Sequence, residues 1–185
     1  MNWTALVPLK QGAERKTRLA GVLLREQRIA MTETMAALLL SCLREVDAIG
    51  RIVLLAPAPM AGVTWRADGG RGVNGELAAY RAEHPRDALL VIHPDLPDVT
   101  PSDIAALLAA TSDGRIAIAP DRHGTGTNAL ALPAGAAIGF AFGPDSCARH
   151  RSAAGNRAAI VERHGLAFDI DEPEDLALMA ARAGS

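Results

Sequence analysis

Short apolar runs alternate along the chain with stretches in which apolar residues recur every three or four positions. The short runs predict buried strands, and the periodic stretches predict amphipathic helices. The predicted strands span residues 4–9, 51–56, 88–92, 115–119, 129–132 and 166–170, and the predicted helices span 28–49, 76–83, 146–164 and 173–183. This alternation indicates an α/β fold with a mostly parallel sheet that helices cover on both faces.

A further helix is expected after the strand at 88–92, because Thr100, Pro101 and Asp103 have the pattern of a helix N-cap. The segment 58–75 is rich in Gly and Pro and predicts a loop. We find no internal repeat and no linker, so we expect residues 1–185 to form a single domain. In such sheets ligands bind beyond the carboxyl ends of the strands, and the informative loops of this chain follow strands.

The composition is that of a globular protein. Of the 185 residues, 49% are hydrophobic and 22% are charged, and the formal net charge is -2, which excludes collagen-like, disordered and disulfide-stapled chains. No apolar stretch reaches the roughly 18 residues of a membrane helix and the start lacks a signal-peptide pattern, so we expect a cytoplasmic protein. The near-neutral charge argues against nucleic-acid binding. Cys42 and Cys147 lie far apart and indicate neither a disulfide framework nor a zinc site.

The basic residues are unevenly divided, since 17 are arginine and two are lysine. Both lysines, Lys10 and Lys16, lie in the loop after the first predicted strand. One interpretation is that these positions need a compact ammonium group rather than a planar guanidinium. The alternative is a pair of solvated loop charges.

Three aspartates follow predicted strands. Asp95 comes directly after one strand, and Asp169 and Asp171 lie two residues apart at the end of another, which places them on the same side of an extended chain. Mg²⁺ prefers oxygen ligands and often rests on one or two carboxylates plus substrate phosphates, so these three residues are candidate ligands. The structural alternatives are a turn at Asp95 and a helix capping box formed by Asp171 and Glu174.

The segment 124–128 has the glycine spacing of a dinucleotide-binding fingerprint, with Ala129 at the third small position. That fingerprint requires a helix afterwards, whereas this sequence predicts a strand, so we reject a dinucleotide site. Two interpretations remain. The segment is either a hairpin turn or a loop whose backbone approaches an anion, with the hydroxyls of Thr125 and Thr127 as further donors.

The residues F-G-P-D-S lead into the helix predicted from Ser146. Ser146 and the backbone N–H groups at a helix N-terminus form a candidate anion site, and Ser146 also fits the role of an N-cap. Three histidines lie beside these loops, namely His93, His123 and His150. Their spacing does not indicate a metal site, and a solvated or hydrogen-bonded histidine is the simpler interpretation for each.

The chain resembles a known family in five segments, taken in order: V-P-L-K…K-T-R-L, P-D-L-P, P-D-R-H-G-T-G-T-N-A-L, F-G-P-D-S-C-A-R-H and D-I-D-E-P-E-D-L. The family is the guanylyltransferases that make the deazaflavin coenzyme of methanogens and actinobacteria. The resemblance implies a three-layer, Rossmann-like fold similar to that of nucleotide-diphospho-sugar transferases. It also implies that GTP activates phosphoenolpyruvate, 2-phospho-L-lactate or 3-phosphoglycerate with release of pyrophosphate.

The resemblance assigns roles to residues of four groups. They are Asp95, Asp169 and Asp171 as Mg²⁺ ligands, Thr127, Gly143 and Ser146 at the acid substrate, Lys10, Lys16 and Arg18 facing the triphosphate as catalytic residues, and Gly72 and Asn74 near the guanine. The implied partners are GTP and a small phosphorylated carboxylic acid, with neither nucleic acid nor membrane. A homodimer and a hand-off of product to the downstream transferase are further expectations from the resemblance.

Two other functions fit the predicted fold. A sugar-phosphate or molybdenum-cofactor-type nucleotidyltransferase shares the fold and the acidic site, but its opening loop has several glycines, whereas this loop has one, Gly12. A catalytically inactive nucleotide-binding subunit belongs to a different class. The presence of all three carboxylates and both lysines argues against that reading.

Overall fold

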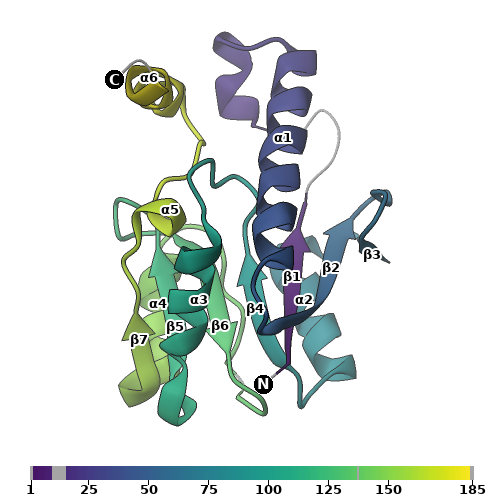
Figure 1. Cartoon of the computed structure of the whole chain (residues 1–185), viewed down its shortest axis with the longest axis vertical. Helices are drawn as coiled ribbons and strands as arrows, with labels where there is room; N and C mark the ends of the chain where they lie inside the picture. Colours follow the sequence, from purple (N-terminus) through teal and green to yellow (C-terminus); the bar gives the residue numbers. More distant parts are fainter. Residues whose placement is uncertain (1, 10–15, 137, 184–185) are drawn as a thin grey trace.

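A seven-stranded sheet forms the middle layer of the structure, a computed structural model that describes residues 2–9, 16–136 and 138–183 (Figure 1). The strand order is β3-β2-β1-β4-β6-β5-β7. β6 runs antiparallel to both β4 and β5, and the other neighbouring pairs are parallel. The amino end of β6 therefore lies at the same edge as the carboxyl ends of the other strands, and we call this edge the carboxyl edge. The strands are β1 (Trp3–Pro8), β2 (Ile49–Ala56), β3 (Thr64–Ala67), β4 (Ala88–Ile92), β5 (Ile116–Pro120), β6 (Thr127–Leu132) and β7 (Ala158–Ile160).

Helices cover both faces of the sheet, which confirms the predicted fold class. One core cluster joins α1, α3 and α5 to one face, and a second joins α2 and α4 to the other. Alternation along β1 follows this division, since Ala5 and Val7 belong to the first cluster and Leu6 to the second. The helices are α1 (Arg25–Arg44), α2 (Gly72–Glu83), α3 (Pro101–Ala109), α4 (Ser146–Ala154), α5 (His164–Ala167) and α6 (Pro173–Ala183), with short 3₁₀ helices η2 (Thr17–Gly21), η3 (Ser112–Gly114) and η4 (Gly155–Arg157).

A third, smaller core cluster joins the last helix to the start of the chain. Leu19 of η2, Met35 of α1, Phe168 and Ile170 are buried together, and partly buried residues of α6 pack against them. Figure 1 shows α6 and the first turns of α1 at the upper end of the molecule, beyond the carboxyl edge of the sheet. The polypeptide segments that precede these two helices are thereby brought to that edge.

Two strands were absent from the sequence prediction. β3 lies within the segment that its Gly and Pro content predicted to be a loop, and β7 lies within the predicted helix 146–164, which ends at Ala154. Both strands are short, lie at the edges of the sheet and bury few side chains, so their local sequence signals are weak. The helix predicted from residue 76 begins earlier, at Gly72.

The strand predicted at 166–170 is wrong. The chain forms the short helix α5 and then an extended segment that pairs with no strand in the part of the chain that the structure describes. Leu166, Phe168 and Ile170 are buried in alternation, so the period-two pattern is real but reflects packing against helices rather than a strand ladder. One backbone bond links the segment to the carboxyl edge, because the N–H of Ile170 donates to the carbonyl of Asp95 at 3.1 Å.

The cap predicted at the start of α3 is confirmed. The N–H of Asp103 donates to the Thr100 hydroxyl, and the Asp103 carboxylate accepts from the N–H of Thr100. Both cysteines are buried and unpaired, as the sequence indicates. Among residues 2–9, 16–136 and 138–183, no helix combines the length and apolar character that crossing a membrane requires.

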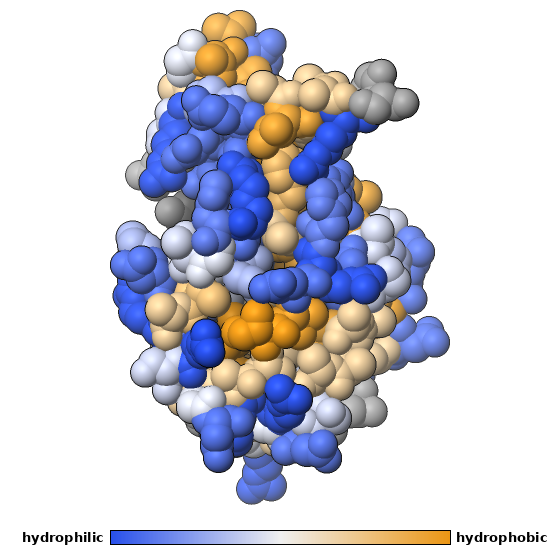
Figure 2. All heavy atoms as spheres, turned by 90° about the vertical axis from the view of Figure 1, so that its left-hand side faces the viewer, coloured by the Kyte–Doolittle hydropathy of each residue, from blue (hydrophilic) through white to orange (hydrophobic). Residues whose placement is uncertain are grey.

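Figure 2 views the molecule from the side of the edge strand β7. Hydrophilic side chains cover most of this face, and hydrophobic surface gathers near its middle. Ile160 of β7 keeps 40% of its surface exposed. Because β7 has three residues, this edge offers few backbone groups for pairing with another strand.

The contact between α5 and the loop before α3 predicts that alanine substitution destabilises the protein at one glycine and not at another. A Cβ on Gly165 would clash with the Asp103 carboxylate and lie 2.5 Å from the carbonyl of Asp98, whereas a Cβ on Gly21 would meet nothing within 4 Å. We expect Gly165→Ala to lower the free energy of unfolding by about 1–3 kcal/mol. Gly21→Ala serves as the control and should leave it within about 0.5 kcal/mol. Urea unfolding of both variants measures this, and equal midpoints would contradict the packing described for α5.

Candidate active site

Lys16 brings two of the predicted metal ligands together at the carboxyl edge. Its ammonium lies 2.5 Å from the carboxylate of Asp95, which follows β4, and 3.1 Å from that of Asp171, which precedes α6. The Lys16 side chain is only 9% exposed, and its backbone adopts a left-handed conformation with φ 48°. Non-glycine residues seldom adopt this conformation, which turns the chain into η2 and directs the side chain inward. Residues that lie 79 and 155 positions away in the sequence thus share one cation.

The charges in this cluster stabilise one another. Burial alone would lower the pKa of Lys16, but Asp95 and Asp171 outweigh burial and raise it. Burial alone would raise the pKa of Asp95, but Lys16 and His93 outweigh burial and lower it. Both groups therefore carry their charge at neutral pH.

Asp169 lies beside this pair, and its carboxyl group is more readily protonated than that of Asp95. Burial and the nearby Asp95 carboxylate raise the pKa of Asp169 to about 6, against the effects of Asn128 and Lys16. The amide of Asn128 donates to the Asp169 carboxylate at 3.4 Å and to the carbonyls of Leu166 and Ala167. Asn128 therefore fixes the segment that carries Asp169, a role that the sequence analysis did not assign to it.

A second residue that the sequence analysis missed fixes Asp171. The buried carboxylate of Asp175 accepts hydrogen bonds from the N–H groups of Asp171 and Glu172 and forms an ion pair with Arg122. Arg122 also donates to the carbonyl of Asp169. The capping box proposed for Asp171 and Glu174 is therefore wrong, because Asp175 supplies the capping carboxylate and the Asp171 side chain faces Lys16. The D-E-P-E-D sequence was a usable signal, since its last Asp stands three residues after the N-cap position.

The two other predicted basic residues have different positions. Arg18, on the exposed turn η2, lies 3.2 Å from Asp171 and 3.3 Å from Glu172. It therefore adds positive charge at the rim of the cluster. Lys10 lies outside the residues that the structure describes.

The donor set of this cluster fits a hard divalent cation. Within the described parts of the chain, no three His, Cys, Asp or Glu side chains stand close enough to hold a metal ion by themselves. Mg²⁺ does not need such a cage, because it is commonly held by one or two carboxylates together with phosphate oxygens. Burial and, second to it, the Asp95 carboxylate raise the pKa of Asp169, and a bound cation would favour its ionised form.

The glycine-rich loop between β5 and β6 is a hairpin turn that satisfies its own donors. The carboxylate of Asp121 accepts from the N–H groups of His123, Thr125 and Gly126 and from the Thr125 hydroxyl. The anion-binding interpretation of this loop is therefore wrong for these groups, because a carboxylate of the chain already takes the place of the anion. Thr127, at the start of β6, is not part of that network.

One of the three residues predicted to contact the acid substrate is bonded to a buried histidine, and the other two lie near that histidine or its second partner in the chain. His150 of α4 is fully buried, and its Nδ1 lies 3.0 Å from the Thr127 hydroxyl. The N–H of Ala141, two residues before Gly143, donates to its Nε2 at 3.0 Å. Ser146 lies one turn before His150 on α4. Ser146 is the first residue of this helix and not its N-cap, since Asp145 occupies the cap position.

The predicted nucleotide-side residues begin α2. The side-chain amide of Asn74 forms two hydrogen bonds with the backbone of Phe142, one as donor at 3.0 Å and one as acceptor at 2.8 Å. Gly72 has φ 70°, a conformation that favours glycine. Glu76 is buried and accepts from the N–H groups of Gly69 and Arg71, which fixes the loop before the helix. Asn74 therefore ties α2 to the segment that leads to Gly143.

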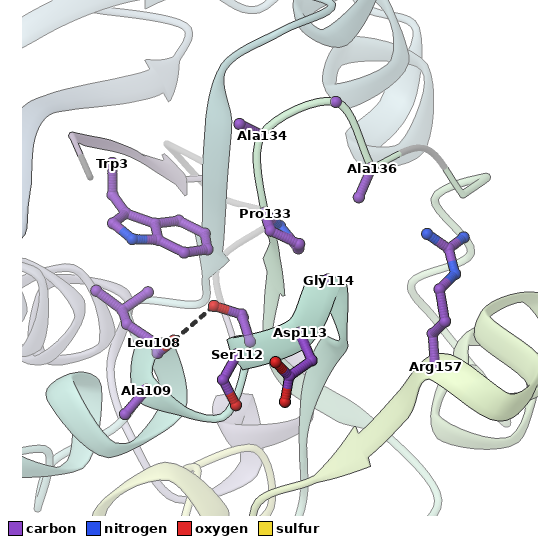
Figure 3. Close-up of a pocket in the computed structure, with 12 residues that line it drawn as sticks. Trp3, Leu108, Ala109, Ser112, Asp113, Gly114, Pro133, Ala134, Ala136 and Arg157 are labelled. Carbon is purple, nitrogen blue, oxygen red and sulfur yellow. Dashed lines mark hydrogen bonds between the residues drawn. The ribbon is translucent and has the colours of Figure 1, made fainter.

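A cavity of about 560 Å³ lies at the opposite edge of the sheet and is separate from the carboxylate cluster (Figure 3). Trp3, Leu108 and Pro133 form apolar walls, and Asp113 and Arg157 line it from two other elements. None of the residues that the sequence assigned to a function lines this cavity.

The structure is an α/β fold with a charged carboxyl edge, the fold of nucleotide-diphospho-sugar transferase-like proteins. Two solved structures share this fold with this chain. One is a protein assigned as a nucleotide-diphospho-sugar transferase from Desulfovibrio desulfuricans, with a TM-score of 0.75, 16% identity and coverage of 96% of this chain and 85% of that one. The other is the 2-C-methyl-D-erythritol 4-phosphate cytidylyltransferase from Thermus thermophilus, with a TM-score of 0.60, 20% identity and coverage of 98% of both chains.

Comparison with protein families identifies the chain more narrowly. The family described as Guanylyl transferase CofC like matches residues 3–182, so the chain belongs to that family and is a guanylyltransferase. It is similar to the phosphoenolpyruvate guanylyltransferase of Sphaerobacter thermophilus, with 36% identity over 99% of this chain and 95% of the relative. The protein of the same name from Rubrobacter xylanophilus is also 36% identical, over 100% of this chain and 96% of the relative. These matches confirm the resemblance seen in the sequence.

The raised pKa of Asp169 predicts a pH-dependent difference in stability between the wild type and Asp169→Asn. The folded-state pKa of about 6 exceeds the ordinary value near 4, so ionising Asp169 destabilises the folded state as the pH rises through this range. We expect the variant to be more stable than the wild type by on the order of 1–3 kcal/mol at pH 7.5, and equal to it below about pH 4. Urea unfolding in the presence of a chelator measures both proteins, and a difference that does not change with pH would contradict the assignment.

Proposed function

We propose that this guanylyltransferase transfers GMP from GTP to phosphoenolpyruvate and releases pyrophosphate, in the biosynthesis of a deazaflavin coenzyme. The observation that carries the proposal is the meeting of Lys16 with Asp95 and Asp171 at the carboxyl edge. The choice of acid is supported by the names of full-length relatives with 36% identity. 2-Phospho-L-lactate and 3-phosphoglycerate are the other acids that the same chemistry would accept.

In this proposal Asp95, Asp169 and Asp171 would hold Mg²⁺ together with the phosphates of GTP. The bound ion would offset the repulsion between two anionic reactants and make the α-phosphorus a better electrophile. The carboxylate donors support this assignment, because burial and the neighbouring Asp95 disfavour ionised Asp169 in the absence of a further cation. Asn128 and Asp175 act indirectly, because they hold the backbone that carries Asp169 and Asp171.

The reaction needs charge balance and alignment rather than a covalent intermediate. A phosphate oxygen of the acid attacks the α-phosphorus of GTP in line, a new P–O bond forms, and the bond from the α-phosphorus to the bridging oxygen breaks. The leaving pyrophosphate takes the electron pair of that bond, and Lys10, Lys16 and Arg18 offset its growing charge. The buried position of Lys16 supports this role, because a charge in a site that excludes water acts more strongly.

The binding sites of the two substrates adjoin each other in this proposal, because Asn74 is bonded to the residue directly before Gly143. Thr127, Gly143 and Ser146 bind the phosphorylated acid, and Gly72 and Asn74 lie on the nucleotide side. The bonds from Asn74 to the backbone of Phe142 support an indirect role for this residue, in which it holds the segment between the two substrates.

Several broader expectations stay predictions. They are a single domain over residues 1–185, a cytoplasmic location, a homodimer and a hand-off of the product to the downstream transferase. Family membership argues against an inactive nucleotide-binding subunit and against a sugar-phosphate or pterin substrate.

The reaction itself is the first prediction. Purified protein with GTP and Mg²⁺ should release pyrophosphate when phosphoenolpyruvate is added, and mass spectrometry should show a GMP-linked acid. Parallel reactions with 2-phospho-L-lactate and 3-phosphoglycerate identify the preferred acid, and the downstream transferase is included in a second set because the product is labile. Folded protein that releases no pyrophosphate with any of the three acids would contradict the proposal.

Removal of a single carboxylate charge should abolish most of the activity. We expect Asp95→Asn and Asp171→Asn each to lower kcat/KM on the order of a thousandfold. This corresponds to a loss of several kcal/mol of transition-state stabilisation. Asp113→Asn is the matched control, because Asp113 is exposed at the opposite edge in a left-handed conformation that asparagine also adopts. Its kcat/KM should stay within about twofold of the wild type. Near-normal turnover in Asp95→Asn or Asp171→Asn, with folding intact, would remove that residue from the site.

The preference for lysine at position 16 gives a separate prediction. Arginine keeps the positive charge but replaces a compact ammonium with a wider planar group, which the narrow space between Asp95 and Asp171 does not fit. We expect Lys16→Arg to lower kcat by at least about tenfold while circular dichroism shows a folded protein. An Arg variant with wild-type kcat would show that charge alone is needed at this position.

A further inference from the structure

The end of the F-G-P-D-S-C-A-R-H segment carries a residue that the proposed reaction does not use. His150 lies on the face of α4 that packs against the sheet, and no part of it is exposed. Both of its ring nitrogens form hydrogen bonds within the chain. The partners belong to two different elements, the start of β6 and the segment that leads to Gly143.

The hydrogen bonds of His150 define its tautomer. The N–H of Ala141 is a donor, so Nε2 must accept, and the ring hydrogen must lie on Nδ1. Nδ1 then donates to the Thr127 hydroxyl at 3.0 Å. Burial, with smaller effects of Arg149 and His93, lowers the pKa of His150 to about 4, which keeps this ring neutral at physiological pH.

The direction of this bond determines what Thr127 can offer a ligand. A hydroxyl has one hydrogen and two acceptor lone pairs. Since the Thr127 oxygen accepts from His150, its own hydrogen is directed toward another acceptor. A phosphate or carboxylate group carries acceptors and no donor when ionised, so this orientation of Thr127 suits an anionic substrate.

The second bond of His150 acts on the segment before Gly143. Ala141 is held by the imidazole, and Phe142 is held on the other side by the amide of Asn74. The Phe142 ring is buried with its centroid 4.8 Å from that of His150 and 5.0 Å from that of His93. The backbone that leads into Gly143 is therefore fixed from both sides.

We propose that His150 is a positioning residue that sets Thr127, Gly143 and Ser146 relative to one another and directs the Thr127 hydroxyl hydrogen at the phosphorylated acid. This inference rests on the proposed function. One imidazole is bonded to the strand of Thr127 and to the segment of Gly143, and it shares a helix with Ser146. Thr127 on the acid side is a direct hydrogen-bond partner of His150, whereas Lys16 and Asp95 are not, so we expect His150 to act mainly on the binding of the acid.

The test is a set of variants in which the two bonds of His150 are removed together or one at a time. His150→Phe keeps a ring of similar size and loses both bonds, and we expect it to raise the KM for the acid by about tenfold or more while the KM for GTP stays within about twofold. His150→Gln keeps an acceptor near the place of Nε2, and His150→Asn keeps a donor near the place of Nδ1. Both should have KM values for the acid between those of the wild type and the Phe variant. His84→Gln, at the far end of α2, is the control and should match the wild type.

A spectroscopic measurement tests the geometry without any requirement that a variant folds. Long-range proton–nitrogen correlation spectra of the wild type at pH 7, with the His150 ring assigned through-bond to its own backbone, should show His150 as the neutral Nδ1–H tautomer. An Nε2–H tautomer or a charged ring at His150 would overturn the inference.

The kinetic outcomes separate this inference from the proposed function. A wild type that releases no pyrophosphate with any of the three acids overturns both. An active wild type together with His150→Phe that has an unchanged KM for the acid, or that raises the KM for GTP to the same extent, overturns the positioning role alone. An equal rise in the KM values for GTP and for the acid would show that His150 supports the fold generally.

Discussion

A single buried ammonium group among carboxylates is the interaction on which the candidate active site depends. Lys16 lies between Asp95, which follows a central strand, and Asp171, which precedes the last helix. Without this cation, two carboxylates close to a third would face one another in a partly buried place, which is unfavourable. The two ion pairs of Lys16 therefore tie the start, the middle and the end of the chain to one edge of the sheet. The same charges make that edge suitable for a metal ion and a triphosphate.

The residues around this site are held by hydrogen bonds that are themselves buried. Asp175 holds the backbone of Asp171 on the metal side, and His150 holds Ala141 and Thr127 on the acid side. Each of these residues uses its polar atoms on the chain and presents none of them as a ligand. Buried polar groups need such partners because an unsatisfied one costs about 1–3 kcal/mol. Positioning of the reactive groups and stability of the fold thus depend on the same bonds.

The central strands, the helix cap of α3 and the family motifs can be predicted from the sequence. The edge strands and most of the residues that position the site cannot, for physical reasons. The strand at Ala88–Ile92 and the cap at Thr100 carry strong local signals, and the order of motifs identifies the family. The edge strands β3 and β7 are short and bury few side chains, so they give weak local signals. The strand expected at 166–170 failed because alternating burial against helices has the same period as a strand in a sheet. The roles of Asn128 and His150 are hidden in the sequence because their partners lie on other elements of the fold, which no local pattern encodes. Asp175 differs, because the D-E-P-E-D pattern is a usable local signal for it.

The carboxylates around Lys16 form the proposed site for the metal and the nucleotide. Crystals of the protein grown with Mn²⁺ and a GTP analogue that cannot be cleaved between the α- and β-phosphates would test it through the anomalous signal of manganese. The account predicts a manganese peak within bonding distance of an oxygen of Asp95 and of at least one of Asp169 and Asp171, with the α-phosphate beside it. A nucleotide and metal bound elsewhere, for example in the cavity beside Asp113, would contradict it.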